Sequence, residues 1–123
     1  MSDRPPVWVG HVVMPSTHVA ETSAYLVKLG LRAIETGDRV AVLELRGGTH
    51  LVVVHSDSPT PRDAKAAFDL MYEDVDAAWK RCQELGLEPS AIEDAPFHRS
   101  FRLVEPSGHE ITVNSTHVSD QPV

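Results

Sequence analysis

The sequence predicts an α+β fold that is built from two similar βαβββ halves in tandem. The triplet Leu29-Gly30-Leu31 recurs as Leu85-Gly86-Leu87, and a helical pattern of apolar residues precedes both copies. β-prone segments separated by turn residues follow both copies. Because a half of about 50 residues buries too little apolar surface to be stable alone, we expect the two halves to fold together.

Each half is predicted to contain one helix that ends at a glycine. In the second half the residues at helical spacing are Val75, Ala78, Trp79, Cys82 and Leu85. Their counterparts in the first half are Val19, Thr22, Ser23, Leu26 and Leu29. Gly30 and Gly86 suit the left-handed position after a helix, whereas Ser16 or Thr17 is predicted to cap the first helix and Asp74 the second.

Strand-like runs flank both helices and give the halves the same element order. In the first half these runs are 7–14, 32–36, 40–46 and 50–55. In the second half they are 67–72, 89–92, 99–104 and 110–114, with a longer loop through Pro96. That loop shifts the alignment of the halves, so that His50 matches Glu110 and Val52 matches Thr112.

The chain is expected to form a single domain over residues 1–123. Module one spans 7–55, module two spans 66–114, and 115–123 is a tail. The stretch 56–65 contains Ser, Pro and charged residues without an apolar period, which predicts an exposed linker between the modules.

The composition restricts the partners and the compartment. Eighteen Asp and Glu residues against eleven Lys and Arg residues give a net charge of −7. An acidic surface repels phosphate backbones and anionic lipids, so nucleic-acid and membrane partners are not expected. No segment has the form of a signal peptide or the length of a membrane span, and the lone Cys82 cannot form an internal disulfide. These features predict a cytoplasmic protein.

Three segments carry a resemblance to a known family. They are GHVVM at 10–14, FDLMYEDVDAAWKRCQELGLEP at 68–89 and LVEPSGHEITV at 103–113. Together they resemble the vicinal oxygen chelate superfamily, which contains glyoxalases, bleomycin resistance proteins and extradiol dioxygenases. The resemblance implies curved mixed sheets that enclose a cavity for a small molecule, commonly within a homodimer. Members include metal-dependent isomerases, ring-cleaving dioxygenases, thiol transferases and metal-free drug-sequestering proteins.

The resemblance also indicates where metal ligands belong. In the metalloenzymes of this superfamily, the ligands come from the first and last strands of each module. These places fall on His11, Val52, Ala67 and Thr112. Val and Ala have no donor atom, and a Thr hydroxyl is a poor ligand for divalent ions. We therefore expect a protein without a resident cofactor.

An alternative set of ligands remains open. His50 shares a strand face with Val52, and Glu110 shares one with Thr112. With His11, these side chains would form a two-His-one-carboxylate set for one divalent ion, Fe, Mn, Ni or Zn. A step of two residues along a strand moves a side chain by about 6–7 Å, so this set needs a register change or a bulge.

Further side chains are candidates for the wall of a cavity. The expected ligand-binding residues are His11, Thr112, Arg102, Phe101 and Phe68. Arg102 would hold a carboxylate or phosphate, and the aromatic rings would stack on a flat ligand, although such rings are more often part of a core. His98 is a candidate for the cavity entrance, whereas His109 is predicted to be an exposed turn residue. Cys82 is predicted to be a buried, inert thiol.

The leading hypothesis is a dimeric small-molecule-binding protein that acts by sequestration or by divergent enzyme chemistry without the usual metal set. Glu110 is the candidate catalytic residue, because it would orient a ligand or take a proton. The alternative is a metal-dependent lyase or isomerase, or a ring-cleaving dioxygenase, that uses His11, His50 and Glu110. A third hypothesis is a subunit with a vestigial cavity. Whether the protein is an enzyme, and which ligand it takes, stay open.

Overall fold

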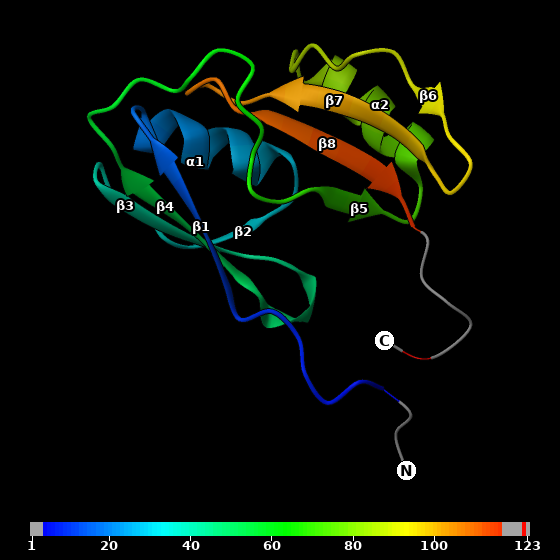
Figure 1. Ribbon diagram of the computed structural model, residues 1–123, viewed down its shortest axis with the longest axis horizontal. Helices are drawn as coiled ribbons and strands as arrows, with labels where there is room; N and C mark the ends of the chain where they lie inside the picture. Colours follow the sequence, from blue (N-terminus) through cyan, green and yellow to red (C-terminus); the bar gives the residue numbers. More distant parts are fainter. Residues whose placement is uncertain (1–3, 117–121, 123) are drawn as a thin grey trace.

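The computed structural model describes residues 4–116 and residue 122, and it contains two βαβββ units (Figure 1). The first unit consists of β1 (His11–Ser16), α1 (Val19–Lys28), β2 (Arg32–Glu35), β3 (Val40–Glu44), a 3₁₀ turn (Arg46–Gly48) and β4 (His50–His55). The second consists of β5 (Leu70–Tyr72), α2 (Val75–Glu84), β6 (Glu93–Asp94), β7 (Arg99–Val104) and β8 (Glu110–Ser115). The predicted tandem α+β architecture is confirmed.

Each unit forms one four-stranded mixed sheet with the same topology. Sheet A has the order β1-β4-β3-β2, and sheet B has the order β5-β8-β7-β6. The first and last strands of each unit pair in parallel, and the other neighbours pair antiparallel. β4 and β8 begin at His50 and Glu110, and these residues pair with Glu44 and Val104, the last residues of β3 and β7. The predicted match between His50 and Glu110 is therefore confirmed.

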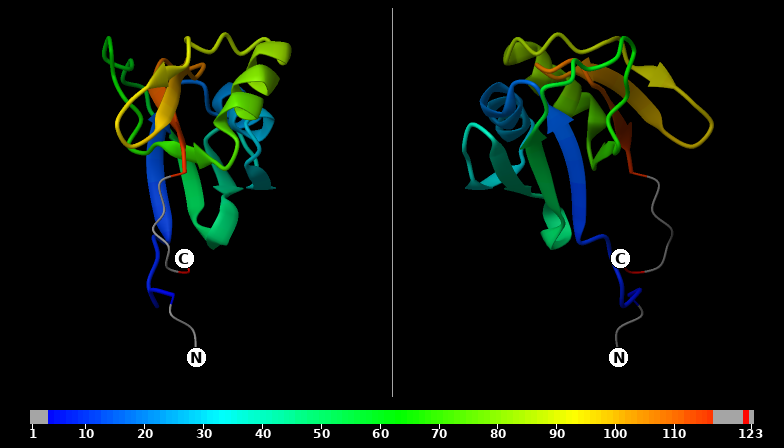
Figure 2. Two further views of the ribbon diagram at one scale, coloured as in Figure 1. Left: turned by 90° about the vertical axis from the view of Figure 1, so that its right-hand side faces the viewer. Right: turned by 60° about the vertical axis from the view of Figure 1, so that its left-hand side comes forward.

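The edge strands differ most from the sequence-based prediction. The first strand was expected from residue 7 but begins at His11. Residues 4–10 precede β1 and extend away from its first residue (Figure 2). Residues 89–92 form no strand, and the short β6 at Glu93–Asp94 takes their place. Residues near the sheet edge have few cross-strand neighbours, so a β-prone composition alone does not fix a strand there.

The first strand of the second unit is interrupted by a bulge. Lys65 bridges to Glu110 in parallel, and Leu70 pairs with Val113. The segment from Lys65 to Leu70 is longer than the facing segment of β8, so the intervening chain bulges out of the sheet. This shortens the predicted strand 67–72 to Leu70–Tyr72.

The helices end as predicted, but only one of them begins as predicted. Asp74 caps α2, because its side chain accepts a hydrogen bond from the Ala77 amide at 3.0 Å. α1 begins after His18 and has no side-chain cap. The Ser16 hydroxyl accepts a hydrogen bond from the His18 amide, which precedes the helix, and not from an amide of the first helical turn. Gly30 and Gly86 adopt φ angles of 112° and 74° after the two helices.

One hydrophobic core draws on both units. Helix α1 packs on sheet A, and α2 packs on sheet B. The core contains Met14, Leu26, Leu43, Leu51 and Val53 from the first unit and Val75, Cys82, Phe101, Leu103, Ile111 and Val113 from the second. Cys82 is buried as predicted, and burial raises the pKa of its thiol. A protonated, buried thiol is a poor nucleophile.

The face of each sheet that is turned away from its helix is called the outer face here. On sheet A this face carries valines, namely Val13, Val40, Val42, Val52 and Val54. On sheet B it carries Ser100, Arg102, Glu110, Thr112 and Asn114. The sheets do not close into a barrel, so the expected enclosed cavity is replaced in a single chain by hollows that open to solvent. In the described part of the chain, no helix is long and apolar enough to span a membrane.

Candidate functional site

The candidate site is a hollow of about 480 Å³ on the outer face of sheet B. Strand β8 supplies Glu110, Thr112 and Asn114 to its lining. Alternate residues of a strand point to the same face, and the intervening Ile111 and Val113 lie in the core. The polar-apolar alternation of this segment therefore places three polar side chains side by side in the hollow.

The bulge before β5 forms the second wall of the hollow. Phe68 and Asp69 line it from this segment, together with Lys65. The backbone of Glu110 is held against the chain at the start of the bulge. Its carbonyl accepts a hydrogen bond from the Ala66 amide at 2.8 Å, and its amide donates one to the Ala64 carbonyl at 2.9 Å. Phe68 is half-buried and also packs against the core. The wall is therefore anchored on both sides.

Asn114 gives the hollow its most specific polar feature. The side chain is only 3% exposed, and its Nδ2 donates to Asp69 Oδ2 at 3.0 Å. Among the described residues, no group donates a hydrogen bond to its Oδ1. The hydrogen bond to Asn114 fixes the Asp69 carboxylate, which is exposed at the wall of the hollow and open to a ligand.

Two predicted ligand-binding residues lie elsewhere. Phe101 is 1% exposed and belongs to the core, which corrects the expectation that it lines a cavity. Arg102 is its neighbour on β7, so the two side chains point to opposite faces. Arg102 pairs with Thr112 and shares its face, but its guanidinium forms an ion pair with Glu93 at 3.2 Å and does not line the hollow.

The two remaining candidate histidines lie together on sheet A. His11 pairs with His50 in the parallel register, and their ring centroids are 5.7 Å apart in an edge-on arrangement. His50 Nε2 lies 3.0 Å from Glu44 Oε2, and Glu44 also accepts a hydrogen bond from Arg32. The hydrogen bonds from Arg32 and His50 lower the pKa of the Glu44 carboxyl. A row of charged and imidazole groups thus crosses sheet A.

Within one chain, the alternative metal ligands are not brought together. His11 and His50 lie on sheet A, whereas Glu110 lies on sheet B. The described residues contain no group of three or more His, Cys, Asp or Glu side chains that could hold a metal ion. His50 already has Glu44 as a partner. The side chains of a single chain therefore do not fit a two-His-one-carboxylate site.

Sequence reasoning missed several features of the hollow. Asn114 continues the alternation of Glu110 and Thr112, so the strand pattern could have identified it. Asp69 lines the hollow because of the bulge, which the sequence does not reveal. His98, a candidate for a cavity entrance, also lines the hollow.

A buried carboxylate outside the hollow was also missed. The side chain of Glu105 is fully buried and lies 2.9 Å from Nδ1 of His109, which is itself only 8% exposed. This corrects the prediction of an exposed His109. The His109 amide also donates to Glu105 Oε2 at 2.8 Å, so His109 is held against this carboxylate.

Comparisons with known proteins agree with this fold. Residues 8–113 match the family model described as the Glyoxalase/Bleomycin resistance protein/Dioxygenase superfamily. A search of curated protein sequences gives no significant match.

Several solved structures share the fold. Lactoylglutathione lyase from Agrobacterium tumefaciens is 16% identical, with a TM-score of 0.73 and coverage of 93% of this chain and 97% of that chain. TnmS3, an antibiotic binding protein from Streptomyces sp. CB03234, is 23% identical, with a TM-score of 0.73 and coverage of 89% of this chain and 95% of that chain. The oxidase ChaP-H1 is 18% identical, with a TM-score of 0.72 and coverage of 89% of this chain and 96% of that chain. At these identities the likeness concerns the fold, and function must be argued from the site. Because the family model spans most of its length, the chain belongs to the glyoxalase/bleomycin resistance protein/dioxygenase superfamily.

Proposed function

We propose that the protein binds a small organic molecule in the hollow on the outer face of sheet B. The observation that carries this proposal is the row of polar side chains that Glu110, Thr112 and Asn114 place in one hollow together with Asp69 and Phe68. Concave sites with a few fixed polar groups and an apolar wall are typical of small-molecule binding. Phe68 supplies such a wall.

The chemistry of the lining favours a ligand that donates hydrogen bonds. Asp69, Glu110 and Thr112 all present acceptor oxygens. A ligand with hydroxyl or ammonium groups next to a flat apolar part would satisfy these acceptors and cover Phe68. One solved relative in fold is an antibiotic binding protein, which supports binding as a function compatible with this architecture.

Binding leads either to sequestration or to catalysis without the usual metal set. For catalysis, Glu110 is the candidate acid or base, because its carboxylate lines the hollow and its backbone is fixed on both sides. The reaction would be of the lyase type known from glyoxalases or the oxidoreductase type known from dioxygenases. His11, on the other sheet, belongs to a ligand site only if a second surface is brought to it.

The binding proposal is tested by thermal shift and calorimetry with a panel of amines, amino sugars and phenols. We expect at least one donor-bearing compound to bind, and we expect Glu110→Gln and Thr112→Val each to weaken it about tenfold, because each removes one polar contact. Glu84→Gln is the matched control, since Glu84 is exposed at the end of α2. Equal binding by all variants would contradict the assignment of the site.

A metal-dependent lyase, isomerase or dioxygenase is the second candidate. The adjacent imidazoles of His11 and His50 favour it only if a second copy of the chain brings a carboxylate to them, because one chain does not bring Glu110 close. Elemental analysis of protein purified without chelators separates the two functions. Stoichiometric metal that is lost in His11→Ala would support the metalloenzyme. Metal-free protein that still binds a ligand would support sequestration.

We further propose that the protein is a homodimer in the cytoplasm. The valine-rich outer face of sheet A supports the dimer, since Val13 is 55% and Val40 is 47% exposed and a second copy would remove both from water. The single buried Cys82 is compatible with a reducing compartment. Sedimentation equilibrium is expected to give a dimer, and a monomer at all concentrations would contradict the proposal.

A further inference from the structure

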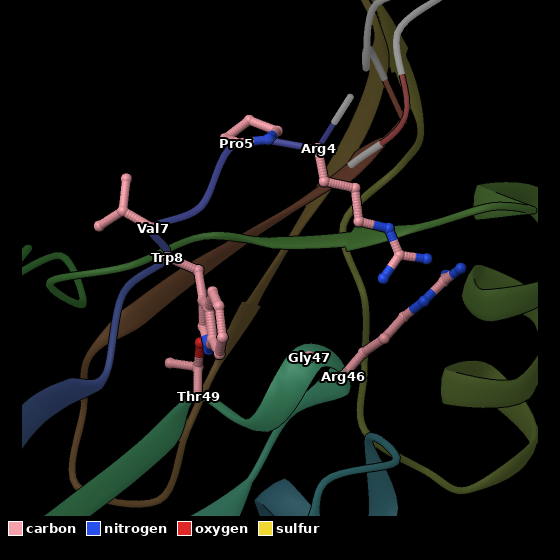
Figure 3. A pocket seen from close by; sticks show the side chains of 7 residues that line it. All are labelled: Arg4, Pro5, Val7, Trp8, Arg46, Gly47 and Thr49. Atoms are coloured by element: carbon pink, nitrogen blue, oxygen red, sulfur yellow. The ribbon is translucent and has the colours of Figure 1, made fainter. Parts of the chain in front are cut away.

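A second pocket, of about 330 Å³, lies where the N-terminal segment passes the turn between β3 and β4 (Figure 3). It shares no lining residue with the hollow on sheet B. Its walls include Arg4, Val7 and Trp8 from the N-terminal segment and Arg46, Gly47 and Thr49 from the turn. The proposed function makes no use of it. The name Arg4–Arg46 pocket is used for it below.

The N-terminal segment is tied to the turn at residues 9 and 10, next to the Arg4–Arg46 pocket. The Thr49 hydroxyl donates to the Val9 carbonyl at 2.6 Å, and the His50 amide donates to the Gly10 carbonyl at 2.9 Å. Gly47 adopts a φ of 87°, and a Cβ at this position would meet no atom within 4 Å. The turn therefore leaves open space beside Gly47, close to the point where the N-terminal segment is tied to it.

Two guanidinium groups give the pocket its charge. Figure 3 shows the side chains of Arg4 and Arg46 reaching toward the same place at the edge of the pocket. Arg46 also forms an ion pair with Glu73 at 3.0 Å, but both side chains are mostly exposed, at 86% and 73%. Such a pair contributes little stability, so a ligand anion can replace Glu73 at low cost. Guanidinium groups bind carboxylates and phosphates with paired hydrogen bonds.

Trp8 gives the pocket an aromatic wall. The side chain is 68% exposed, and the adjacent Val7 is 75% exposed. A large indole ring left in water beside two guanidinium groups is poorly explained by packing, because an exposed apolar patch rimmed by polar groups is typical of a binding surface. An indole face stacks well on another flat ring.

We propose that the Arg4–Arg46 pocket binds a planar aromatic anion. The carboxylate or phosphate of the ligand lies on the Arg46 guanidinium, beside Arg4, and its ring stacks on Trp8. The pocket brings two Arg side chains together on a chain whose net charge is −7. Two neighbouring positive groups attract an anionic ligand to this place. The site is independent of the hollow on sheet B, so either one can fail without the other.

Isothermal titration calorimetry with 2-naphthoate and 2-naphthyl phosphate tests this proposal, with 2-naphthalenemethanol as the neutral analogue. Binding of either anion, weakened by added salt, is the expected result. Arg46→Gln should weaken binding about tenfold because a charged hydrogen-bond pair is lost, and Trp8→Ala should weaken it about fivefold because the stack is lost.

Two control variants match these changes away from the pocket. Arg81→Gln removes one exposed positive charge on α2, and Phe97→Ala removes an aromatic ring that is 83% exposed. Both should bind the anions as the wild type does. The proposal is overturned if neither anion binds at millimolar concentration, if the neutral analogue binds equally well, or if the control variants lose as much affinity as Arg46→Gln. The relative affinity of the two anions tells a carboxylate ligand from a phosphate ligand.

Discussion

Replacing Glu105 by alanine is expected to lower the free energy of unfolding by about 3–5 kcal/mol. The carboxylate is fully buried and accepts hydrogen bonds from Thr22 Oγ1 at 2.7 Å, from the Ser107 hydroxyl at 2.5 Å and from the His109 amide at 2.8 Å. Thr22 lies on α1 of the first unit, so the carboxylate joins the two units. Its removal leaves several buried donors without a partner. Urea unfolding at pH 7 measures the change.

The pH dependence of stability provides a control for this interpretation. Burial alone would raise the pKa of the Glu105 carboxyl, but the hydrogen bonds from Ser107, Thr22 and His109 outweigh it and hold the pKa below its usual value. A carboxyl whose pKa is lower in the folded protein than in the unfolded chain stabilises the fold at pH values above the unfolded pKa of about 4.3. This stabilisation is lost as the pH falls through the pKa of the folded state. The wild type should therefore lose more stability between pH 7 and pH 3 than Glu105→Gln does. Equal losses of stability in the two proteins would contradict the role assigned to Glu105.

Phe101→Ala is expected to cost about 3–5 kcal/mol of stability, because the ring is 1% exposed and its removal leaves a cavity in the core. Phe97→Ala is the matched control and should change stability by less than about 0.5 kcal/mol, since that ring is 83% exposed. Urea unfolding of both variants checks the difference. A stable Phe101→Ala protein with weakened ligand binding would instead place Phe101 at a binding site.

Most of the fold follows from local patterns in the sequence. The repeated Leu-Gly-Leu triplets mark the ends of two helices, and the apolar stripes before them mark the faces that pack on the sheets. The strands in the middle of each sheet follow from alternating residues, as in Glu110–Ser115. The short strands at the edges do not, because β6 at Glu93–Asp94 and the start of β1 at His11 depend on neighbours that the local sequence does not specify.

The candidate site is less predictable than the fold. Glu110 and Thr112 could be assigned to one face because a strand has a period of two. Asp69 could not, because the bulge between Lys65 and Leu70 decides where it points. Phe101 and Arg102 were both expected in a cavity, although neighbours on a strand cannot share a face. The burial of Glu105 depends on Thr22, which is distant in the sequence, so no local pattern indicates it.

The central claim is that the hollow on the outer face of sheet B is the ligand site. The most direct test is to titrate the protein with a compound that binds and to follow its backbone amide chemical shifts by NMR. The claim predicts the largest changes at Asp69, Glu110, Thr112 and Asn114, with small changes at His11 and His50. Changes centred on His11 and His50, with none along β8, would contradict it.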